Sequence, residues 1–181
     1  MSTIRIVGLA VVASALIGSL AFARQGAKVG AKAPDFSAPG TDGKTYDLKS
    51  LAKNGDVYLY FIKIGCPVNH RAAPHFKKIA NAYGAKANLI GVIDGDVNEA
   101  KQWAKEYGTS FTILADPKMK IIRAYGAQYS PWVVQVSKGK VAKVWDEGSS
   151  KTLTVLNKLA ATTAGKKVAV LNFDGAPTGG G

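Results

Sequence analysis

The residue most suited to chemistry in this sequence is Cys66, the single cysteine of the 181-residue chain. Lys63 lies three residues before it, and His70 and Arg71 follow it closely. The thiolate is the nucleophilic form of cysteine, and neighbouring cations favour that form. This grouping predicts a reactive thiol. The alternative is a buried, inert cysteine, because free cysteines are among the most buried residues.

The segments on either side of Cys66 place it between a strand and a helix. Residues 57–62 are nearly all apolar, which is typical of a strand buried on both faces of a parallel sheet. A helix is expected to begin at Pro67 or Asn69 and to end at Tyr83, because its apolar residues recur at helical spacing. The thiol is therefore predicted at a helix N-terminus, where unpaired backbone N–H groups and the helix dipole stabilise negative charge.

The remaining elements alternate along the chain. The expected strands are residues 36–38, 45–47, 57–62, 88–93, 111–114, 131–136 and 140–145. The expected helices are residues 48–52, 69–83, 97–107, 116–125 and 151–163. This order predicts an α/β fold with a central mixed sheet, in which a parallel core carries an antiparallel edge hairpin and helices flank the sheet.

Outside that domain the chain has a leader, a linker and a tail. Residues 1–23 combine one arginine, an apolar run and a small-x-small site, the pattern of a cleavable signal peptide. The alternative is an uncleaved membrane anchor. Residues 24–33 are interpreted as a linker and residues 34–164 as the domain. Residues 165–181 are expected to hold an extra edge strand, at 167–173, followed by a flexible tail.

The predicted leader and the net charge of the chain limit the classes of partner that the protein can have. Export places the domain in the periplasm or outside the cell, and an uncleaved leader would hold it at a membrane, facing away from the cytoplasm. The formal net charge is +12, but the lysines are scattered. A scattered basic surface on an exported protein does not favour nucleic acid as a partner. A membrane is a partner only if the leader is uncleaved.

Five short motifs carry a resemblance. They are GAKAPDF at residues 30–36, Asp42-Gly43-Lys44 with Leu48, Cys66-Pro67, Pro74, and Asp116-Pro117 through Tyr125-Gly126 to Ser130-Pro131. In this order they resemble the redoxin branch of the alkyl hydroperoxide reductase/thiol-specific antioxidant (AhpC/TSA) superfamily, over residues 30–163. The resemblance implies a thioredoxin-like fold, a nucleophile at Cys66 supported by Pro67, and a cis-proline at Pro131 that faces the thiol.

Two residues depart from the redox branches of that superfamily. Thiol-disulfide oxidoreductases carry a second cysteine where this chain has Asn69, and peroxiredoxins carry Thr or Ser where it has Lys63. Without a second cysteine, a peroxide would give a sulfenic acid and a disulfide would give a mixed disulfide. The resemblance therefore implies an antioxidant or oxidoreductase in cell redox homeostasis, with an external thiol reductant or a disulfide protein as its partner. It implies no cofactor.

The supporting residues also have structural interpretations. Asn69 can cap the helix or hydrogen-bond a sulfenate, and capping is preferred. Trp132 either lines the mouth of the site or packs in the core, and core packing is preferred. Pro131 could simply begin an edge strand. Arg71 is expected to face solvent rather than substrate.

Two further classes of function stay open. The domain could be a non-enzymatic binding module that keeps the fold without a second cysteine. It could also be a copper or zinc carrier, because Cys66 and His70 are four residues apart and could share one helix face. Solvent-facing side chains at His70 and His75 are the preferred alternative to that metal site.

Overall fold

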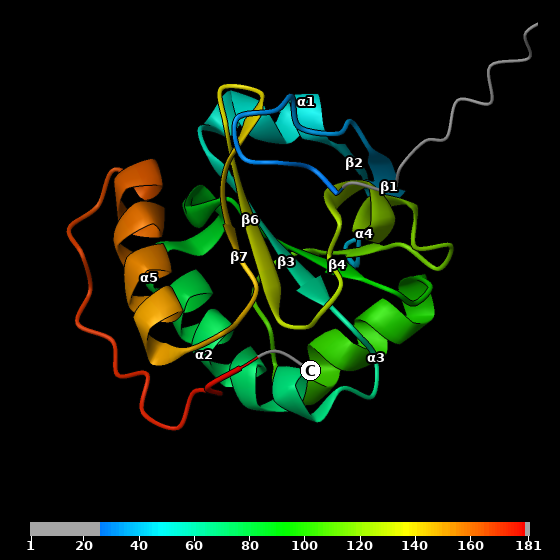
Figure 1. Cartoon of the computed structure of the whole chain (residues 1–181). Coiled ribbons are helices and arrows are strands. Elements are labelled where there is room, and N and C mark those ends of the chain that lie inside the picture. Colours follow the sequence, from blue (N-terminus) through cyan, green and yellow to red (C-terminus); the bar gives the residue numbers. More distant parts are fainter. Residues whose placement is uncertain (1–25, 180–181) are drawn as a thin grey trace, which may run out of the picture.

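The computed structural model describes residues 26–179, so the predicted signal or anchor at residues 1–23 lies outside the described part. The strands are β1 (Ser37–Pro39), β2 (Thr45–Asp47), β3 (Val57–Ile62), β4 (Leu89–Ile93), β5 (Ile113–Ala115), β6 (Trp132–Ser137) and β7 (Lys140–Trp145) (Figure 1). The helices are α1 (Leu48–Leu51), α2 (Pro67–Tyr83), α3 (Val97–Tyr107), α4 (Lys120–Tyr125) and α5 (Ser150–Ala164), with 3₁₀ turns η1 (Ala52–Asn54) and η2 (Gly84–Ala87). None of the helices within residues 26–179 is long and apolar enough to span a bilayer.

A five-stranded sheet in the order β5-β4-β3-β6-β7 forms the centre of the molecule. β3 pairs in parallel with β4, and β4 with β5, whereas β6 runs antiparallel to both β3 and β7. The predicted mixed sheet, with its parallel core and antiparallel hairpin, is confirmed. Since β3 and β6 run in opposite directions, the last residue of β3 and the first residue of β6 lie at the same end of the sheet.

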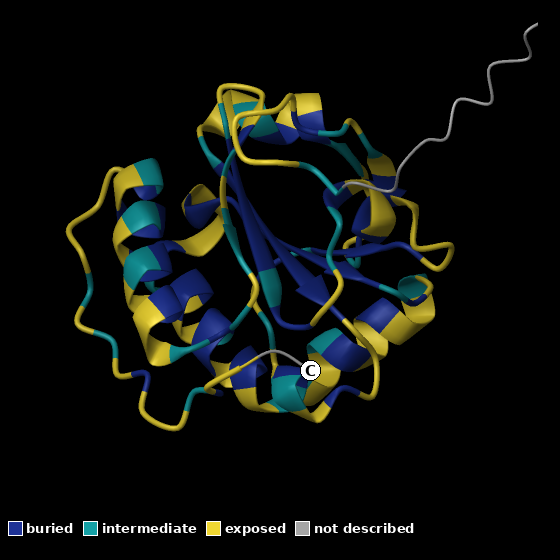
Figure 2. Cartoon of the chain, viewed as in Figure 1, coloured by how far each residue is buried: buried dark blue, intermediate teal, exposed yellow. Residues whose placement is uncertain are grey.

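The central strand β3 is buried along its whole length and divides the core in two (Figure 2). Tyr58, Tyr60 and Ile62 face the core cluster that α2, α3 and α5 complete. The alternate residues of β3 face a second cluster, to which α1 and α4 contribute. The uninterrupted apolar run that predicted a strand buried on both faces is explained by these two layers.

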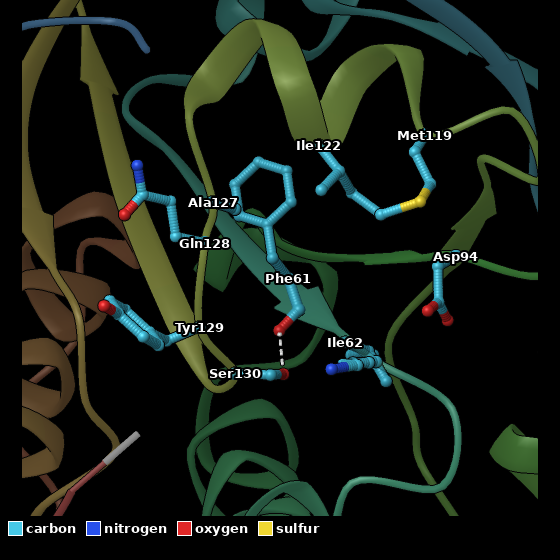
Figure 3. A pocket seen from close by; sticks show the side chains of 10 residues that line it. Phe61, Ile62, Asp94, Met119, Ile122, Ala127, Gln128, Tyr129 and Ser130 are labelled. Carbon is cyan, nitrogen blue, oxygen red and sulfur yellow. Dashed lines mark hydrogen bonds between the residues drawn. The ribbon is translucent and has the colours of Figure 1, made fainter. Parts of the chain in front are cut away.

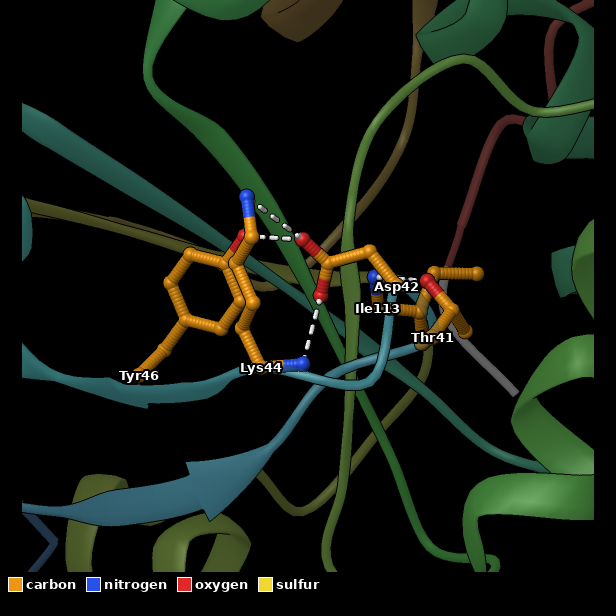
Figure 4. A network of polar contacts seen from close by, with 5 residues as sticks. All are labelled: Thr41, Asp42, Lys44, Tyr46 and Ile113. Atoms are coloured by element: carbon orange, nitrogen blue, oxygen red, sulfur yellow. Dashed lines mark hydrogen bonds and ion pairs between the residues drawn. The ribbon is translucent and has the colours of Figure 1, made fainter.

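The hairpin of β1 and β2 is hydrogen-bonded to the outer side of β5 (Figure 4). Thr41 N donates to Ile113 O at 3.0 Å, and Ile113 N donates to Thr41 Oγ1 at 3.3 Å. The turn is fixed by Asp42, which accepts hydrogen bonds from the hydroxyl of Tyr46 at 2.6 Å and from the backbone N–H of Lys44 at 3.2 Å. One edge of the central sheet is therefore partly covered.

The other edge is covered at its beginning by a segment that the sequence predicted to be a linker. Within residues 24–33, Gly30 N donates to Val141 O at 2.8 Å, and Val141 N donates back to Ala31 O at 3.0 Å. Ala33 N donates to Gly139 O at 2.9 Å. Residues 30–33 are thus bonded to the beginning of β7, and the linker interpretation is wrong for them.

The end of the chain differs from the expected edge strand at 167–173. Residues 166–179, here called the C-terminal strap, form no strand and lie along α2 and α5 (Figure 1). Ala169 N donates to the Tyr83 hydroxyl at 2.9 Å, and Asn157 Nδ2 donates to Ala169 O at 2.9 Å. Phe173 is buried in the first core cluster. The apolar alternation of the strap therefore packs on helices, because neighbouring segments already pair with both edges of the sheet.

Candidate functional site

Cys66 lies where the sequence predicted it, at the junction of β3 and α2. It is the residue that precedes the first turn of α2, and Pro67 occupies the first helical position. No side chain caps this helix end, so its first backbone N–H groups face the region of the thiol without a side-chain partner. Cys66 is 6% exposed, and its Sγ donates to the Ser130 carbonyl oxygen at 3.8 Å.

The Ser130–Pro131 peptide bond is cis, and its carbonyl is the one that meets the thiol. The predicted location and isomer of Pro131 are therefore confirmed. Gly148, which sequence reasoning missed, supports this proline. A Cβ atom at Gly148 would lie 2.6 Å from Pro131 Cγ and 3.4 Å from Ala72 Cβ, so a larger residue would displace the proline ring. The position lies in a loop after β7, and no pattern in the sequence marks it.

Asn69 does not cap α2, contrary to the preferred interpretation. Its side chain is completely buried and joins three segments of the chain. Asn69 Oδ1 accepts a hydrogen bond from the Tyr60 hydroxyl at 2.7 Å, while Nδ2 donates to Ser130 Oγ and, at 3.4 Å, to Lys63 O. Ser130 Oγ donates in turn to Phe61 O at 3.1 Å. Asn69 thus ties β3 and the cis-proline segment to the helix that carries the thiol.

Tyr60 belongs to this network, and the sequence analysis did not identify it as a site residue. It is fully buried, and its ring stacks on Phe76 with centroids 3.8 Å apart. Burial raises the pKa of Tyr60 well above its usual value, and the nearby Cys66 acts in the same direction, so the hydroxyl stays protonated and donates to Asn69. A hydroxyl within an otherwise apolar strand needs a buried partner, and this was the signal available in the sequence.

The other predicted supporting residues are Lys63, Arg71 and Trp132. Lys63 and Arg71 are exposed, and within residues 26–179 neither side chain makes a hydrogen bond or an ion pair. Their effect on the thiol stays a prediction. Trp132 packs against the second core cluster, with its ring 6.5 Å from that of Tyr129. Its indole nitrogen is buried and finds no partner in the described part of the chain.

His70 faces α3. Its Nδ1 contacts the hydroxyl of Tyr107 and lies 3.9 Å from Glu106 Oε1, and the same hydroxyl donates to Glu106 at 2.7 Å. Burial and the bonded carboxylate raise the pKa of Tyr107 to about 12. Within residues 26–179 no group of three or more His, Cys, Asp or Glu side chains could hold a metal ion. The pairing of Cys66 with His70 therefore gains no further ligand there.

His75 is buried, contrary to the expectation of a solvent-facing side chain. Its ring lies 6.1 Å from that of Phe173 in the C-terminal strap. His75 Nδ1 is buried and has no hydrogen-bond partner among the residues that the structure describes. Burial lowers the pKa of His75, and the nearby Lys78 ammonium lowers it further. The side chain is therefore part of the packing between α2 and the strap.

A small pocket of about 90 Å³ opens beside the cis-proline segment (Figure 3). Its walls come from the ends of β3 and β4, from α4 and from the segment that leads to Pro131. The lining residues are Phe61, Ile62, Lys63, Asp94, Met119, Ile122, Ala127, Gln128, Tyr129 and Ser130. Cys66 is not among them, but Ser130 borders the pocket and contacts the sulfur. The arrangement joins a buried thiol, a backbone carbonyl and a largely apolar pocket.

The chain is similar to proteins that are already known. Residues 29–158 match the AhpC/TSA family. The thiol-disulfide oxidoreductase ResA of Halalkalibacterium halodurans is 30% identical over 132 residues, which are 70% of this chain and 73% of the relative. A putative thiol:disulfide interchange protein DsbE from Chlorobium tepidum is 25% identical, with a TM-score of 0.65, over 76% of this chain and 99% of that one.

A third similar structure is the exposed lipoprotein thioredoxin Etrx1 of Streptococcus pneumoniae. It is 28% identical, with a TM-score of 0.58, and the alignment covers 70% of this chain and 98% of that one. The family match covers most of the present chain, from the segment paired with β7 to within α5. With its thioredoxin-like fold and its cysteine at the junction of β3 and α2, the chain belongs to the AhpC/TSA family.

Proposed function

We propose that this protein is an oxidoreductase that uses Cys66 as its single thiol and acts on disulfides outside the cytoplasm. One observation carries the proposal. The position three residues after the nucleophile, where dithiol oxidoreductases hold their second cysteine, is filled by a buried Asn69 with hydrogen bonds to Tyr60 and Ser130. A chain with one thiol can open a partner's disulfide, but it needs an outside thiol to complete the cycle.

The reaction balances with two external thiols. The Cys66 thiolate attacks one sulfur of the partner disulfide, so that a mixed disulfide forms and the other partner sulfur leaves as a thiolate. An external thiolate then displaces Cys66 from the partner sulfur, and a second one releases the partner as a thiol. The partner disulfide has gained two electrons, and the two external thiols have become a disulfide.

The surroundings of the thiol have distinct roles in this scheme. The first turn of α2 directs backbone N–H groups without a side-chain partner towards the region of the Cys66 sulfur. The pocket beside Ser130 accepts an apolar side chain that neighbours the partner's cysteine, because most of its lining is apolar. Lys63 stands where a peroxiredoxin would place a hydroxyl, so disulfide exchange is preferred over peroxide reduction. The names of the ResA and DsbE relatives support the same chemistry.

Export rests on the predicted leader and on one relative. Residues 1–23 have the pattern of a signal peptide, and the pneumococcal relative is described as an exposed lipoprotein. A fusion of residues 1–33 to a phosphatase that is active only outside the cytoplasm tests this part. An inactive fusion, alongside an active one that carries a known signal peptide, contradicts export.

The thiol chemistry is tested on the full-length protein with oxidised glutathione as the disulfide. Intact mass should show one glutathione adduct on the wild type and none on Cys66→Ser. In Asn69→Cys a second thiol stands where the family resolves the adduct, so the adduct should disappear at least about tenfold faster, because the attack is intramolecular. Asn69→Ser, which loses the amide but gains no thiol, is the matched control.

Two outcomes would reject this function. If the folded protein forms no adduct although Cys66 is alkylated after unfolding, the domain is a binding module. If hydrogen peroxide with a sulfenic-acid trap modifies Cys66 while several disulfides do not, the protein reduces peroxides instead. Equal adduct lifetimes in the Cys and Ser variants at position 69 would contradict the role assigned to Asn69.

A further inference from the structure

A second concave surface lies far from the thiol. It has a volume of about 420 Å³, and Ala33, Leu48 and Ala52 contribute its apolar part. The remaining lining residues are Lys32, Lys49, Lys53, Asp35 and Gly139. We call this feature the lysine groove. No step of the proposed thiol chemistry uses it.

The fold brings these lysines together from three segments. Lys32 lies opposite Lys140 in an antiparallel bridge, because residues 30–33 pair with the beginning of β7. Lys49 in α1 and Lys53 in η1 are four residues apart, which is about one helical turn. Lys138 and Lys140 flank Gly139 in the turn between β6 and β7. All five lysines are exposed.

Few carboxylates oppose this charge. Asp35 lies 3.4 Å from Lys32, but their side chains are 73% and 82% exposed, so the pair is screened by water. Asp47 is already used to cap α1, where its carboxylate accepts a hydrogen bond from Ser50 N at 2.9 Å. Three lysines and one aspartate thus line the groove itself. A surface of this kind attracts anions.

The groove lies at the opposite end of the sheet from Cys66. β3 runs from this end towards the thiol, while β6 starts beside Pro131 and ends at the turn with Gly139. A strand of six residues spans about 20 Å, which separates the two ends. An anion bound in the groove therefore leaves the thiol free.

We propose that the lysine groove binds anionic phospholipid headgroups at a membrane surface. The position of the leader in the chain favours this partner. The apolar run of the leader ends near Ala23, and the first described residue, Gly26, lies against Gly126 at the end of α4, six residues before Lys32. The residues between Ala23 and Lys32 span at most about 30 Å even when they are fully extended. A leader in or near a bilayer therefore keeps the groove close to the headgroups, where each lysine is attracted by anionic lipid.

The proposal gives the protein an orientation. With the lysine groove on the membrane, the end of the sheet that carries Cys66 and the pocket beside Ser130 points away from the bilayer. The thiol is then presented to soluble partners. Cleavage of the leader would leave the groove as a weaker, salt-sensitive attachment.

The test is flotation of the full-length protein with vesicles of phosphatidylcholine alone or of phosphatidylcholine with phosphatidylglycerol. The triple variant Lys32→Glu, Lys49→Glu, Lys53→Glu changes the groove. The control Lys101→Glu, Lys105→Glu, Lys158→Glu makes the same change of net charge at exposed positions of α3 and α5. The leader is present in every protein, so it contributes equally to each comparison.

The groove variant should bind anionic vesicles at least about tenfold more weakly than the wild type. The control should change much less, and salt near 1 M should remove the preference for anionic lipid. The neutral triple variant with Gln at positions 32, 49 and 53 should fall between wild type and the Glu triple, and alkylation of Cys66 at the wild-type rate shows that each variant is folded.

Equal losses in the groove and control variants would overturn the proposal, because net charge would then explain binding. So would an equal affinity of the wild type for both kinds of vesicle. If inorganic phosphate at millimolar concentration binds the wild type but not the groove variant, while anionic vesicles show no preference, the groove is a site for free anions and the membrane proposal is wrong.

Discussion

At one end of the central sheet Cys66 and Pro131 lie among buried, hydrogen-bonded side chains, whereas at the other end exposed lysines surround an open groove. Asn69 shows the difference: both polar atoms of its side chain have partners inside the protein. Lys49 and Lys53, by contrast, are exposed to solvent. The contrast shows that the structure of the thiol end depends on individual hydrogen bonds. The binding proposed for the lysine end depends on the total charge of several side chains.

The largest effect on stability is expected for Asn69→Ala. The change leaves the Tyr60 hydroxyl buried without an acceptor and removes the donor to Ser130, so the free energy of unfolding should fall by about 2–4 kcal/mol. Urea unfolding measures it. Asn98→Ala is the control, because this residue is exposed on α3, and the expected change is within about 0.5 kcal/mol. Similar losses of unfolding free energy in the two variants would show that the buried hydrogen bonds of Asn69 contribute no more than an exposed side chain.

Gly148→Ala should have the next largest effect. Its added methyl group meets the ring of Pro131 at 2.6 Å, so either the proline segment shifts or the loop does, at a cost of about 1–3 kcal/mol. Alkylation of Cys66 should change rate in this variant, because the carbonyl that contacts the sulfur belongs to the same segment. Gly179→Ala, where an added Cβ has open space, is the control. An unchanged alkylation rate would show that Gly148 does not affect the reactivity of Cys66.

A smaller effect is expected from pH at His75. Burial lowers the pKa of His75 in the folded protein, so below about pH 6.5 the unfolded chain takes up a proton that the folded chain resists. The contribution of this residue to stability is therefore complete above that pH and is lost as the pH falls. Urea midpoints at pH 7.5 and pH 5 should differ more for the wild type than for His75→Leu. Parallel pH profiles would contradict the buried, neutral histidine.

The smallest effect on stability is expected at the lysine end. Each of Lys32→Gln, Lys49→Gln and Lys53→Gln should change the free energy of unfolding by less than about 0.5 kcal/mol, because exposed charges contribute little. Urea unfolding of the three variants measures this. A loss of several kcal/mol in any of them would show that the groove is part of the packed structure, and would end the comparison between the two ends.

The sequence predicted the central strand and the following helix, because each has a local signal. The apolar run at Val57–Ile62 and the helical spacing within Pro67–Tyr83 depend on neighbours along the chain. The position of Pro131 came from the family resemblance. These features together were enough to predict the place of Cys66.

The role of Asn69 could not be predicted in the same way. Capping is a local interaction, whereas the observed partners Tyr60 and Ser130 lie 9 and 61 residues away in the sequence. The prediction of an edge strand in the C-terminal strap was wrong for a related reason. Its alternating apolar residues are those of an edge strand, but whether a strand forms depends on a free sheet edge, and Thr41 and Gly30 are already bonded to the two edges.

The pairing of these segments with the sheet has a consequence for the behaviour of the protein in concentrated surroundings. An edge strand with free backbone groups is a template on which a second chain can add, and this is one route to fibres. Thr41 occupies the outer side of β5, and residues 30–33 occupy the beginning of β7. The folded domain therefore offers less open edge for another chain to extend, and the part of β7 after Val141 is where such a pairing could still begin.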